Sequence, residues 1–357
     1  MLDFASDNAA GVSAPILDAL RGANLGTAPA YGEDAWTERA HRRLEDVFET
    51  RLSMFLVATG TAANALALGA LCPSFGAAFC HVNAHVAEDE CGAPEMFTAG
   101  AKLVGVAGGA GKIAPQALAA TLKAFPRGPV KQAQPAALSL SQATEAGTAY
   151  DPDEIARLAG MAHAAGLGVH MDGARFANAL VELGVSPADM SWRAGVDILS
   201  FGATKNGALA CEAVLVFDPA RATTLPFQRK RSGHTLSKGR FLGAQMLAYL
   251  EDGHWLDNAH AANARAARLH DGLAAARLNL PWPRQANEVF ALLPARVDAG
   301  LRAAGARYYD WSDRDYGEGR RADEVFARFV TSFATTEPEV DALLSLVRDA
   351  AAQPEGS

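Results

Sequence analysis

Short apolar runs alternate with helical patterns along most of the chain, and this alternation predicts an α/β fold. The runs have the length of buried strands and end in Gly or polar residues. They are Met54–Ala58, Ala77–Val82, Lys102–Val106, Ala136–Leu140, Leu167–Met171, Val196–Phe201 and Ala213–Phe217. Helical patterns lie between several of them, for example over Asp153–Ala165. Such alternation is typical of a mainly parallel sheet covered by helices.

The last third of the chain has a pattern of its own, which predicts a small α/β domain. A chain of 357 residues exceeds one ordinary core, so we expect a large domain over 1–245 and a small domain over 246–357. The tail 353–357 is expected to be disordered. The elements expected in the small domain are a helix over Leu256–Ala275, a strand over Glu288–Leu293, a helix over Ala295–Ala304, a strand over Glu324–Phe329 and a helix over Glu337–Ala351.

Composition and charge narrow the class of protein. The chain is 50% hydrophobic and 20% charged, with a formal net charge of -8, which favours a globular protein without a nucleic-acid partner. Its four cysteines form no CxxC pair, so neither a zinc site nor a disulfide framework is indicated. We expect no membrane partner and a cytoplasmic location, because no apolar run reaches membrane-spanning length and no signal-peptide pattern opens the chain.

Lys205 stands in a short turn, Ser200–Gly207, directly after an apolar run. A strand end that leads into the interior would desolvate its ammonium group and favour the neutral amine, which is the form that makes an imine. A lone lysine in a loop more often extends into solvent. The functional interpretation therefore depends on the residues upstream.

One upstream segment has the features of a phosphate site. Thr59–Asn64 follows the run Met54–Ala58 at once and opens a helix of small residues. The free N–H groups and the positive end of a helix dipole then meet at Gly60 and Thr61. Neither a Rossmann nor a Walker pattern is present. Gly108–Lys112 has the wrong glycine spacing for a Walker loop and is predicted to be a surface turn.

Polar residues also follow other predicted strands. Ligands of such sheets lie outside the carboxyl ends of the strands, so Gln142–Glu145, Asp172–Arg175 and Lys205 are expected to converge. After the run that ends at Val82 come His85 and Glu90, which could bind a metal together with His81 if both histidines shared a helix face. His85 could instead stack on a planar cofactor.

The combined chemistry is that of a pyridoxal phosphate (PLP) site. An ionised Asp172 could keep a pyridine nitrogen protonated, while Lys205 forms an imine with the aldehyde. The phosphate would lie on Gly60 and Thr61, and His85 would stack on the ring.

Three segments carry a resemblance to a known family. Tyr31–Asp34, His170–Ala179 and Ser200–Gly207 resemble the low-specificity L-threonine aldolase family of fold-type I PLP enzymes, and most closely its bacterial branch with the L-phenylserine aldolases. The similarity runs from about Phe4 to about Val347. It implies a transferase-like large domain with a mainly parallel seven-stranded sheet and a small C-terminal α/β domain. It also implies PLP as cofactor and a homotetramer with active sites at subunit interfaces.

The reaction implied by the resemblance is the cleavage of L-threonine, L-allo-threonine and related β-hydroxy-α-amino acids, such as phenylserine, to glycine and an aldehyde. The resemblance makes Lys205 the imine lysine, Asp172 the partner of the pyridine nitrogen and His85 the histidine over the ring. Gly60 and Thr61 correspond to the phosphate-binding residues.

The resemblance also assigns the substrate site. Arg175 would lie near the cofactor O3′ and the substrate carboxylate, which Ser6 and Arg328 would also bind. Tyr31 belongs to the same expected substrate site. Arg229 would reach the phosphate of a neighbouring subunit, although Arg229–Arg231 taken alone would be read as a solvated basic patch.

The chain departs from the family at one position. Better-known members have a second active-site histidine where this chain has Glu145. His85 is therefore our first candidate for the general base, and Glu145 is the second. Two alternatives to an aldolase stay open: another PLP reaction, such as racemisation, transamination or β-elimination, and a non-catalytic protein that binds a phosphate ligand on the same fold.

Overall fold

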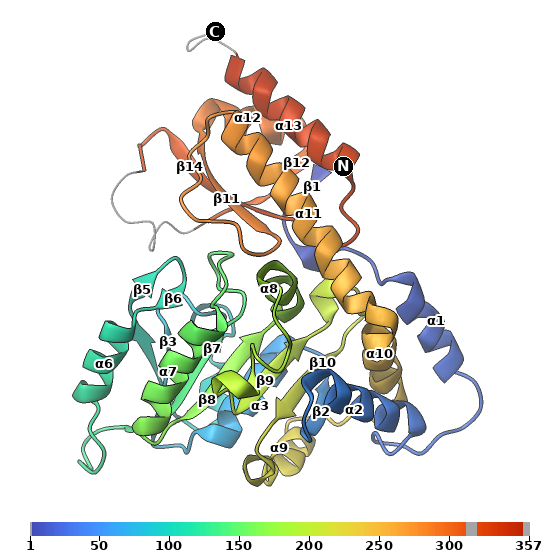
Figure 1. The fold of residues 1–357 in the computed structure, drawn as a ribbon, viewed down its shortest axis with the longest axis vertical. Helices are drawn as coiled ribbons and strands as arrows, with labels where there is room; N and C mark the ends of the chain where they lie inside the picture. Colours follow the sequence, from blue (N-terminus) through green and yellow to red (C-terminus); the bar gives the residue numbers. More distant parts are fainter. Residues whose placement is uncertain (1, 312–319, 353–357) are drawn as a thin grey trace.

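The computed structural model describes residues 2–311 and 320–352, so the tail expected at 353–357 lies outside the described residues. A large α/β part lies below a smaller one in the view of Figure 1, and the long helix α11 joins the two. The helices are α1 (Ala14–Ala23), α2 (Ala35–Phe48), α3 (Gly60–Leu71), α4 (His85–Glu88), α5 (Ala93–Phe97), α6 (Pro115–Ala124), α7 (Pro152–Ala164), α8 (Phe176–Leu183), α9 (Leu225–Arg231), α10 (Arg240–Leu250), α11 (His254–Ala275), α12 (Ala295–Ala303) and α13 (Glu337–Ala352).

Most strands coincide with the apolar runs of the sequence. They are β1 (Leu2–Asp3), β2 (Ser53–Val57), β3 (Gly76–His81), β4 (Lys102–Val106), β5 (Gly108–Gly109), β6 (Lys112–Ile113), β7 (Gln134–Ser141), β8 (Gly168–Gly173), β9 (Ile198–Gly202), β10 (Glu212–Val216), β11 (Glu288–Pro294), β12 (Ala306–Arg307), β13 (Tyr309–Asp310) and β14 (Glu324–Val330). The turn predicted over Gly108–Lys112 is confirmed, because it joins the antiparallel pair β5 and β6.

The central sheet has seven strands in the order β2-β10-β9-β8-β7-β3-β4. The pairs from β9 to β4 are parallel, whereas β10 runs antiparallel to both β2 and β9. The predicted mainly parallel seven-stranded sheet is therefore confirmed. The carboxyl ends of β3, β7, β8 and β9 lie along one edge.

Helices cover both faces of this sheet, as the alternation of side chains requires. Along β10, Ala213 and Leu215 point into a core shared with α2, α6, α7, α8 and α10. Val214 and Val216 point into the opposite core, which α3 and α9 cover. Burial on both faces explains why the strands read as continuous apolar runs.

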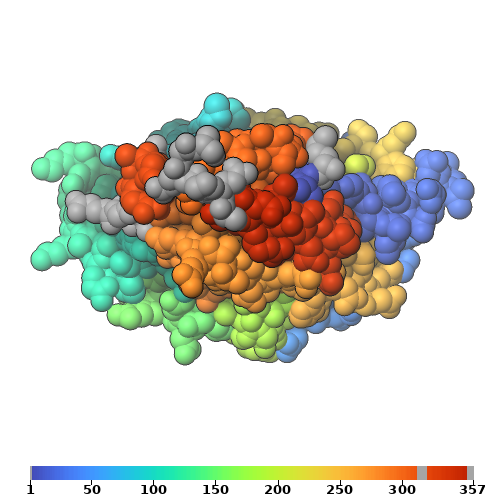
Figure 2. All heavy atoms as spheres, turned by 90° about the horizontal axis from the view of Figure 1, so that it is seen from above, coloured from blue at the N-terminus to red at the C-terminus, as the bar shows by residue number. Residues whose placement is uncertain are grey.

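The C-terminal part has its own sheet, β11-β14-β13, which is antiparallel. Side chains of α11, α12 and α13 pack on it around a separate core. Seen from above, this part lies across the middle of the molecule in orange to red (Figure 2). The small C-terminal α/β domain is thus present.

The N-terminus joins this smaller core, which the sequence pattern did not reveal. The two-residue strand β1 pairs in parallel with β12, and Phe4 is buried in the small core. The proposed boundary between residues 245 and 246 falls inside α10, whose side chains pack in the core of the large sheet. The division of the chain at that point stays a prediction. None of the described helices is both long and apolar enough to cross a membrane.

The contact between α10 and α2 leads to a stability prediction. A Cβ atom added at Gly243 would lie 2.5 Å from the backbone nitrogen of Thr37 and 2.7 Å from its Cα. The main chain at Thr37 would have to shift to make room for this atom, so Gly243→Ala should lower the free energy of unfolding by roughly 1–3 kcal/mol. Urea denaturation measures the change. Gly160→Ala, at a helical position with no atom within 4 Å of the new Cβ, is the control and should not destabilise. Equal midpoints for Gly243→Ala and the unmodified chain would refute the argument.

Candidate active site

One cavity of about 300 Å³ lies at the carboxyl ends of the central strands. The residues that line it include many of those predicted from the sequence: Gly60, Thr61, His85, Glu145, Asp172 and Lys205. The expectation that polar residues after different strands converge is therefore confirmed for this set. The role of each residue stays a prediction.

Lys205 reaches the cavity from the short 3-10 helix Thr204–Asn206, which follows β9. Two buried hydrogen bonds stabilise this turn: the Asn206 amide donates to the Tyr249 hydroxyl at 2.9 Å and to the Trp255 carbonyl at 2.8 Å. Before the turn, β9 passes so close to the backbone of Ala174 that a Cβ at Gly202 would lie 2.7 Å from the Ala174 carbonyl oxygen. The lysine thus stands on a rigid support.

Glu212 is a site residue that the sequence reasoning missed. It opens β10, lines the same cavity and accepts the Ala203 N–H at 2.9 Å. Burial raises the pKa of its carboxyl group to about 7, while Lys205 is among the groups that lower it. The sequence gives no clear signal for it, because its place in the site follows from the antiparallel pairing of β10 with β9, which sets Glu212 opposite Gly202.

The helix α3 presents its N-terminus to the cavity. Thr59 is the N-cap, and its hydroxyl oxygen accepts the Ala62 N–H at 3.2 Å. The N–H groups of Gly60 and Thr61 precede the first hydrogen bond inside the helix and therefore remain available for an anion. This arrangement fits the phosphate of PLP.

A buried hydrogen-bonded chain of polar groups lies beside it. The Asn64 amide donates to Asp172 at 2.9 Å and to Glu90 at 2.8 Å. Nδ1 of His85 is in turn 2.8 Å from Glu90. The hydrogen bond to Glu90 raises the pKa of His85, and burial raises the pKa of Glu90. These hydrogen bonds fix the orientations of both the Asp172 carboxylate and the His85 ring, the two groups expected to contact the cofactor ring. Asn64 and Glu90 were not predicted as site residues.

The metal alternative from the sequence required His81 and His85 to share a helix face, and this condition is not met. His81 ends β3, its Nδ1 accepts the Asn83 N–H at 3.2 Å, and it does not share a helix with His85. A different set, His85, Glu90 and Asp172, has potential ligand atoms within 4.8 Å of one another. Asn64 donates to both carboxylates of that set, so the amide group already occupies the position between them.

Two predicted arginines converge just beyond the cavity. Nε and Nη2 of Arg175 donate to Asp7 at 2.8 Å and 3.2 Å, and its Nη1 lies 3.3 Å from Glu288. Arg328 packs its guanidinium 4.1 Å from the ring centre of Trp311 and lies 3.8 Å from Glu288. Although burial lowers the pKa of Arg175, the charges of Asp7 and Glu288 outweigh it and leave that pKa raised. Asp7 and Glu288 were not predicted.

Three further predicted residues, like the two arginines, do not line the cavity in this chain. The Ser6 hydroxyl accepts the Asn8 N–H at 3.2 Å and caps a short 3-10 helix, while its neighbour Asn8 lines the cavity. Tyr31 is exposed, with Nζ of Lys230 over its ring at 4.8 Å. Arg229 donates to the His234 carbonyl at 3.3 Å, and burial lowers its pKa.

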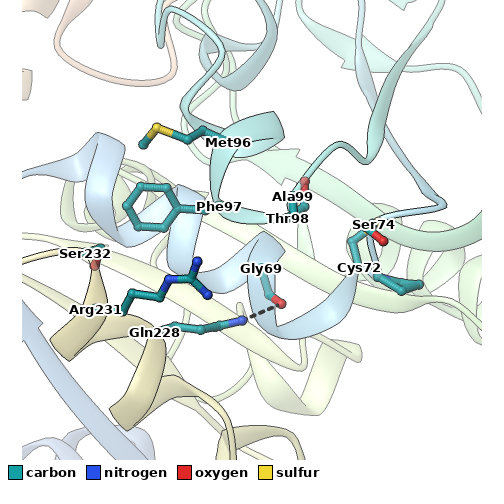
Figure 3. Close-up of a pocket in the computed structure, with 11 residues that line it drawn as sticks. Gly69, Cys72, Ser74, Met96, Phe97, Thr98, Ala99, Gln228, Arg231 and Ser232 are labelled. Carbon is teal, nitrogen blue, oxygen red and sulfur yellow. Dashed lines mark hydrogen bonds between the residues drawn. The ribbon is translucent and has the colours of Figure 1, made fainter.

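A second cavity, of about 560 Å³, lies between α3, α5 and α9 (Figure 3). In that view Phe97 and the Arg231 side chain lie on one side of it, and the dashed line marks the Gln228 amide donating to the Gly69 carbonyl at 3.1 Å. None of the predicted site residues lines this cavity.

The fold and the lysine-containing cavity define a fold-type I PLP enzyme, and comparisons with known proteins agree. Residues 3–295 match the family described as beta-eliminating lyase. The chain is also 42% identical over 348 residues to the low specificity L-threonine aldolase of Pseudomonas aeruginosa, covering 97% of this chain and 96% of the relative. It belongs to the low-specificity L-threonine aldolase family.

Solved structures give the same result for the fold. A threonine aldolase of Leishmania major superimposes with a TM-score of 0.90 at 25% identity, over 98% of this chain and 99% of that one. A structure described as SPT, solved with PLP, has a TM-score of 0.69 at 15% identity, over 98% and 86% of the two chains. At that identity the likeness concerns the fold alone.

The contact between His85 and Glu90 predicts a titration. Because the hydrogen bond to Glu90 is the largest cause that raises the pKa of His85, Glu90→Gln should lower that pKa. The histidine should then lose its proton at lower pH than in the unmodified chain. NMR of histidine-labelled protein measures the midpoint. Asp89→Asn, at the exposed position next to Glu90, is the control and should leave the midpoint in place. An unchanged midpoint in Glu90→Gln would show that the hydrogen bond does not govern His85.

Proposed function

We propose that this protein is a PLP-dependent aldolase that cleaves L-threonine, L-allo-threonine and related β-hydroxy-α-amino acids, such as phenylserine, to glycine and an aldehyde. The observation that carries the proposal is the convergence of Lys205, Asp172 and His85 on one cavity. The 42% identity to a low specificity L-threonine aldolase over nearly the whole chain supports it. A protein that only binds a phosphate ligand would have no need of the lysine.

The residues around the cavity are suited to hold PLP. Lys205 would bind its aldehyde carbon, the N-terminus of α3 at Gly60 and Thr61 would hold its phosphate, and Asp172 would pair with its ring nitrogen. When bound, PLP supplies an electron-poor ring that accepts the electron pair released as the Cα–Cβ bond breaks. Asn64 keeps Asp172 oriented by its 2.9 Å hydrogen bond.

The arginines are suited to hold the substrate carboxylate. Arg175 and Arg328 both direct an Nη1 group toward the same region, and the charge of Glu145 reaches Arg175 as well. Ser6, at the start of the segment that contains Asp7 and Asn8, would add a hydroxyl donor. Fixing the carboxylate at two points sets the orientation of the bond to be broken.

His85 is the better placed of the two candidate bases. Its Nδ1 faces the Glu90 carboxylate at 2.8 Å, so a proton on Nδ1 would leave Nε2 unprotonated and able to accept the proton of the β-hydroxyl. Glu145 lines the same cavity, and its negative charge raises the pKa of His85. We assign Glu145 the role of an electrostatic partner, which favours the protonated histidine after transfer.

Tyr31 and Arg229 are proposed to serve the active site of a second copy in a homotetramer. Both lie on surface segments outside the cavity of their own chain, and Lys230 beside Arg229 stacks on Tyr31. Light scattering gives the mass in solution. A monomer at working concentration would rule out this role of Arg229.

The reaction itself has a direct test. Lys205→Ala should lose turnover by several orders of magnitude, because no other lysine among the described residues lines the cavity and could form the imine. Product analysis with L-threonine and phenylserine should give glycine together with acetaldehyde or benzaldehyde. Ammonia with 2-oxobutanoate from threonine or phenylpyruvate from phenylserine would indicate β-elimination instead. A keto acid that keeps the β-hydroxyl would indicate transamination, and the epimer inverted at Cα would indicate racemisation. Turnover retained by Lys205→Ala would overturn the whole scheme.

The base assignment predicts a separate result. His85→Asn should lower kcat by roughly 10²–10⁴-fold, because proton transfer in the transition state contributes that much. A base must be unprotonated, so kcat should rise with pH through the pKa of His85, which lies above its ordinary value of 6.5. Glu145→Gln should shift that limb to lower pH, because a charge that raises the pKa is removed. Full activity in His85→Asn would transfer the role to Glu145 or to water.

A further inference from the structure

Glu288 is a buried acid that the proposed reaction does not use. It opens β11, its side chain has 0% exposure, and neither of its carboxylate oxygens accepts a hydrogen bond from any described residue. A buried carboxylate without hydrogen bonds is costly, and native proteins rarely keep one without a reason.

The position of Glu288 relates it to the carboxylate site. Nη1 of Arg175 lies 3.3 Å from its Oε1, and Nη1 of Arg328 lies 3.8 Å from the same atom. Nε and Nη2 of Arg175 are already bonded to Asp7. Three of the five N–H donors of Arg175 therefore remain, and the two on Nη1 are the nearest to Glu288.

The charges around Glu288 come from four groups on separate elements. Arg175 precedes α8 and Arg328 lies on β14, and both lower the pKa of Glu288. Burial is the larger cause and raises that pKa, and the charges of Glu145 and Asp7 raise it as well. A substrate carboxylate on the same two arginines would add a further negative charge beside Glu288 and would favour its neutral form further.

We propose that Glu288 is a positioning residue of the carboxylate site. It forms ion pairs with Arg175 and Arg328 while the site is empty, and it takes up one proton from solvent when a substrate carboxylate binds to these arginines. The inference rests on the proposed function in taking Arg175 and Arg328 as the carboxylate site. Binding then favours the protonated acid. The affinity for a carboxylate ligand should therefore fall as pH rises and Glu288 becomes ionised.

Proton uptake is the direct measurement. Glycine is titrated calorimetrically into the holoenzyme in buffers of different ionisation enthalpy between about pH 6 and about pH 9, a range in which free carboxylic acids are ionised. Uptake by the amine and the cofactor is common to all variants and cancels in the comparison. The unmodified protein should take up more protons per glycine than Glu288→Gln, by up to one per site. The dissociation constant of the unmodified protein for glycine, divided by that of Glu288→Gln, should increase with pH.

Glu182→Gln is the matched control. Glu182 also pairs with a partly buried arginine, because Arg284 donates to both of its oxygens at 2.7 Å and 2.8 Å, and it does not line the cavity. This variant should keep the proton uptake of the unmodified protein. Equal uptake in the unmodified protein and Glu288→Gln would overturn the proposal. The proposed function is decided separately, by the release of glycine and an aldehyde from L-threonine.

An infrared difference spectrum supports the test without a variant, which matters if Glu288→Gln does not fold. Glycine binding to the unmodified holoenzyme should produce the C=O band of a newly protonated carboxyl group, sensitive to deuterium exchange. The absence of that band would refute the proposal on its own. Failure of glycine to bind at all would instead count against Arg175 and Arg328 as the carboxylate site, and so against the proposed function.

Discussion

The parallel pairing of β9, β8, β7 and β3 is the constraint on which the candidate site depends. Each of these strands is buried on both faces, and the site residues lie at or after the carboxyl ends, as Asp172 does near the end of β8. Their carboxyl ends must therefore emerge at one edge, where the chain can place polar residues without breaking the core. Asp172 and Lys205, 33 positions apart in the sequence (205 − 172), meet there because their strands are neighbours.

The buried carboxylates Asp172 and Glu90 are tolerated at this edge because neighbouring side chains form hydrogen bonds with them. Asn64 bridges Asp172 and Glu90, and Glu90 faces His85, so two buried carboxylates share one amide and one histidine. Removing one member would leave another without its partner, which costs more than the hydrogen bond itself contributes. The network explains why Asn64 and Glu90 belong to the site although neither was expected to contact a cofactor.

Much of the large domain could be predicted from the sequence, because buried parallel strands are continuous apolar runs with turn residues after them. Val196–Phe201 and β9 agree to within two residues at the start and one at the end. The strand β1 could not be predicted, since two residues carry no periodicity and its partner β12 lies some 300 residues away. Glu212 and Glu288 were missed for a related reason: each opens a strand, where an acid normally marks a solvated end.

The proposed carboxylate site lies where the N-terminus, the large domain and the small domain meet. Asp7 comes from the N-terminus, Arg175 from the large sheet, and Asn287 and Arg328 from the small domain. Asn287 donates to Asp7 at 3.1 Å and to the Thr331 carbonyl at 2.6 Å, so the N-terminal segment is fixed to the small domain at the point where it holds Arg175. The spacing between the two arginines therefore depends on how the small domain and the N-terminus pack on the large sheet. In the proposed function, packing far from the reacting bond would therefore set the geometry that orients it.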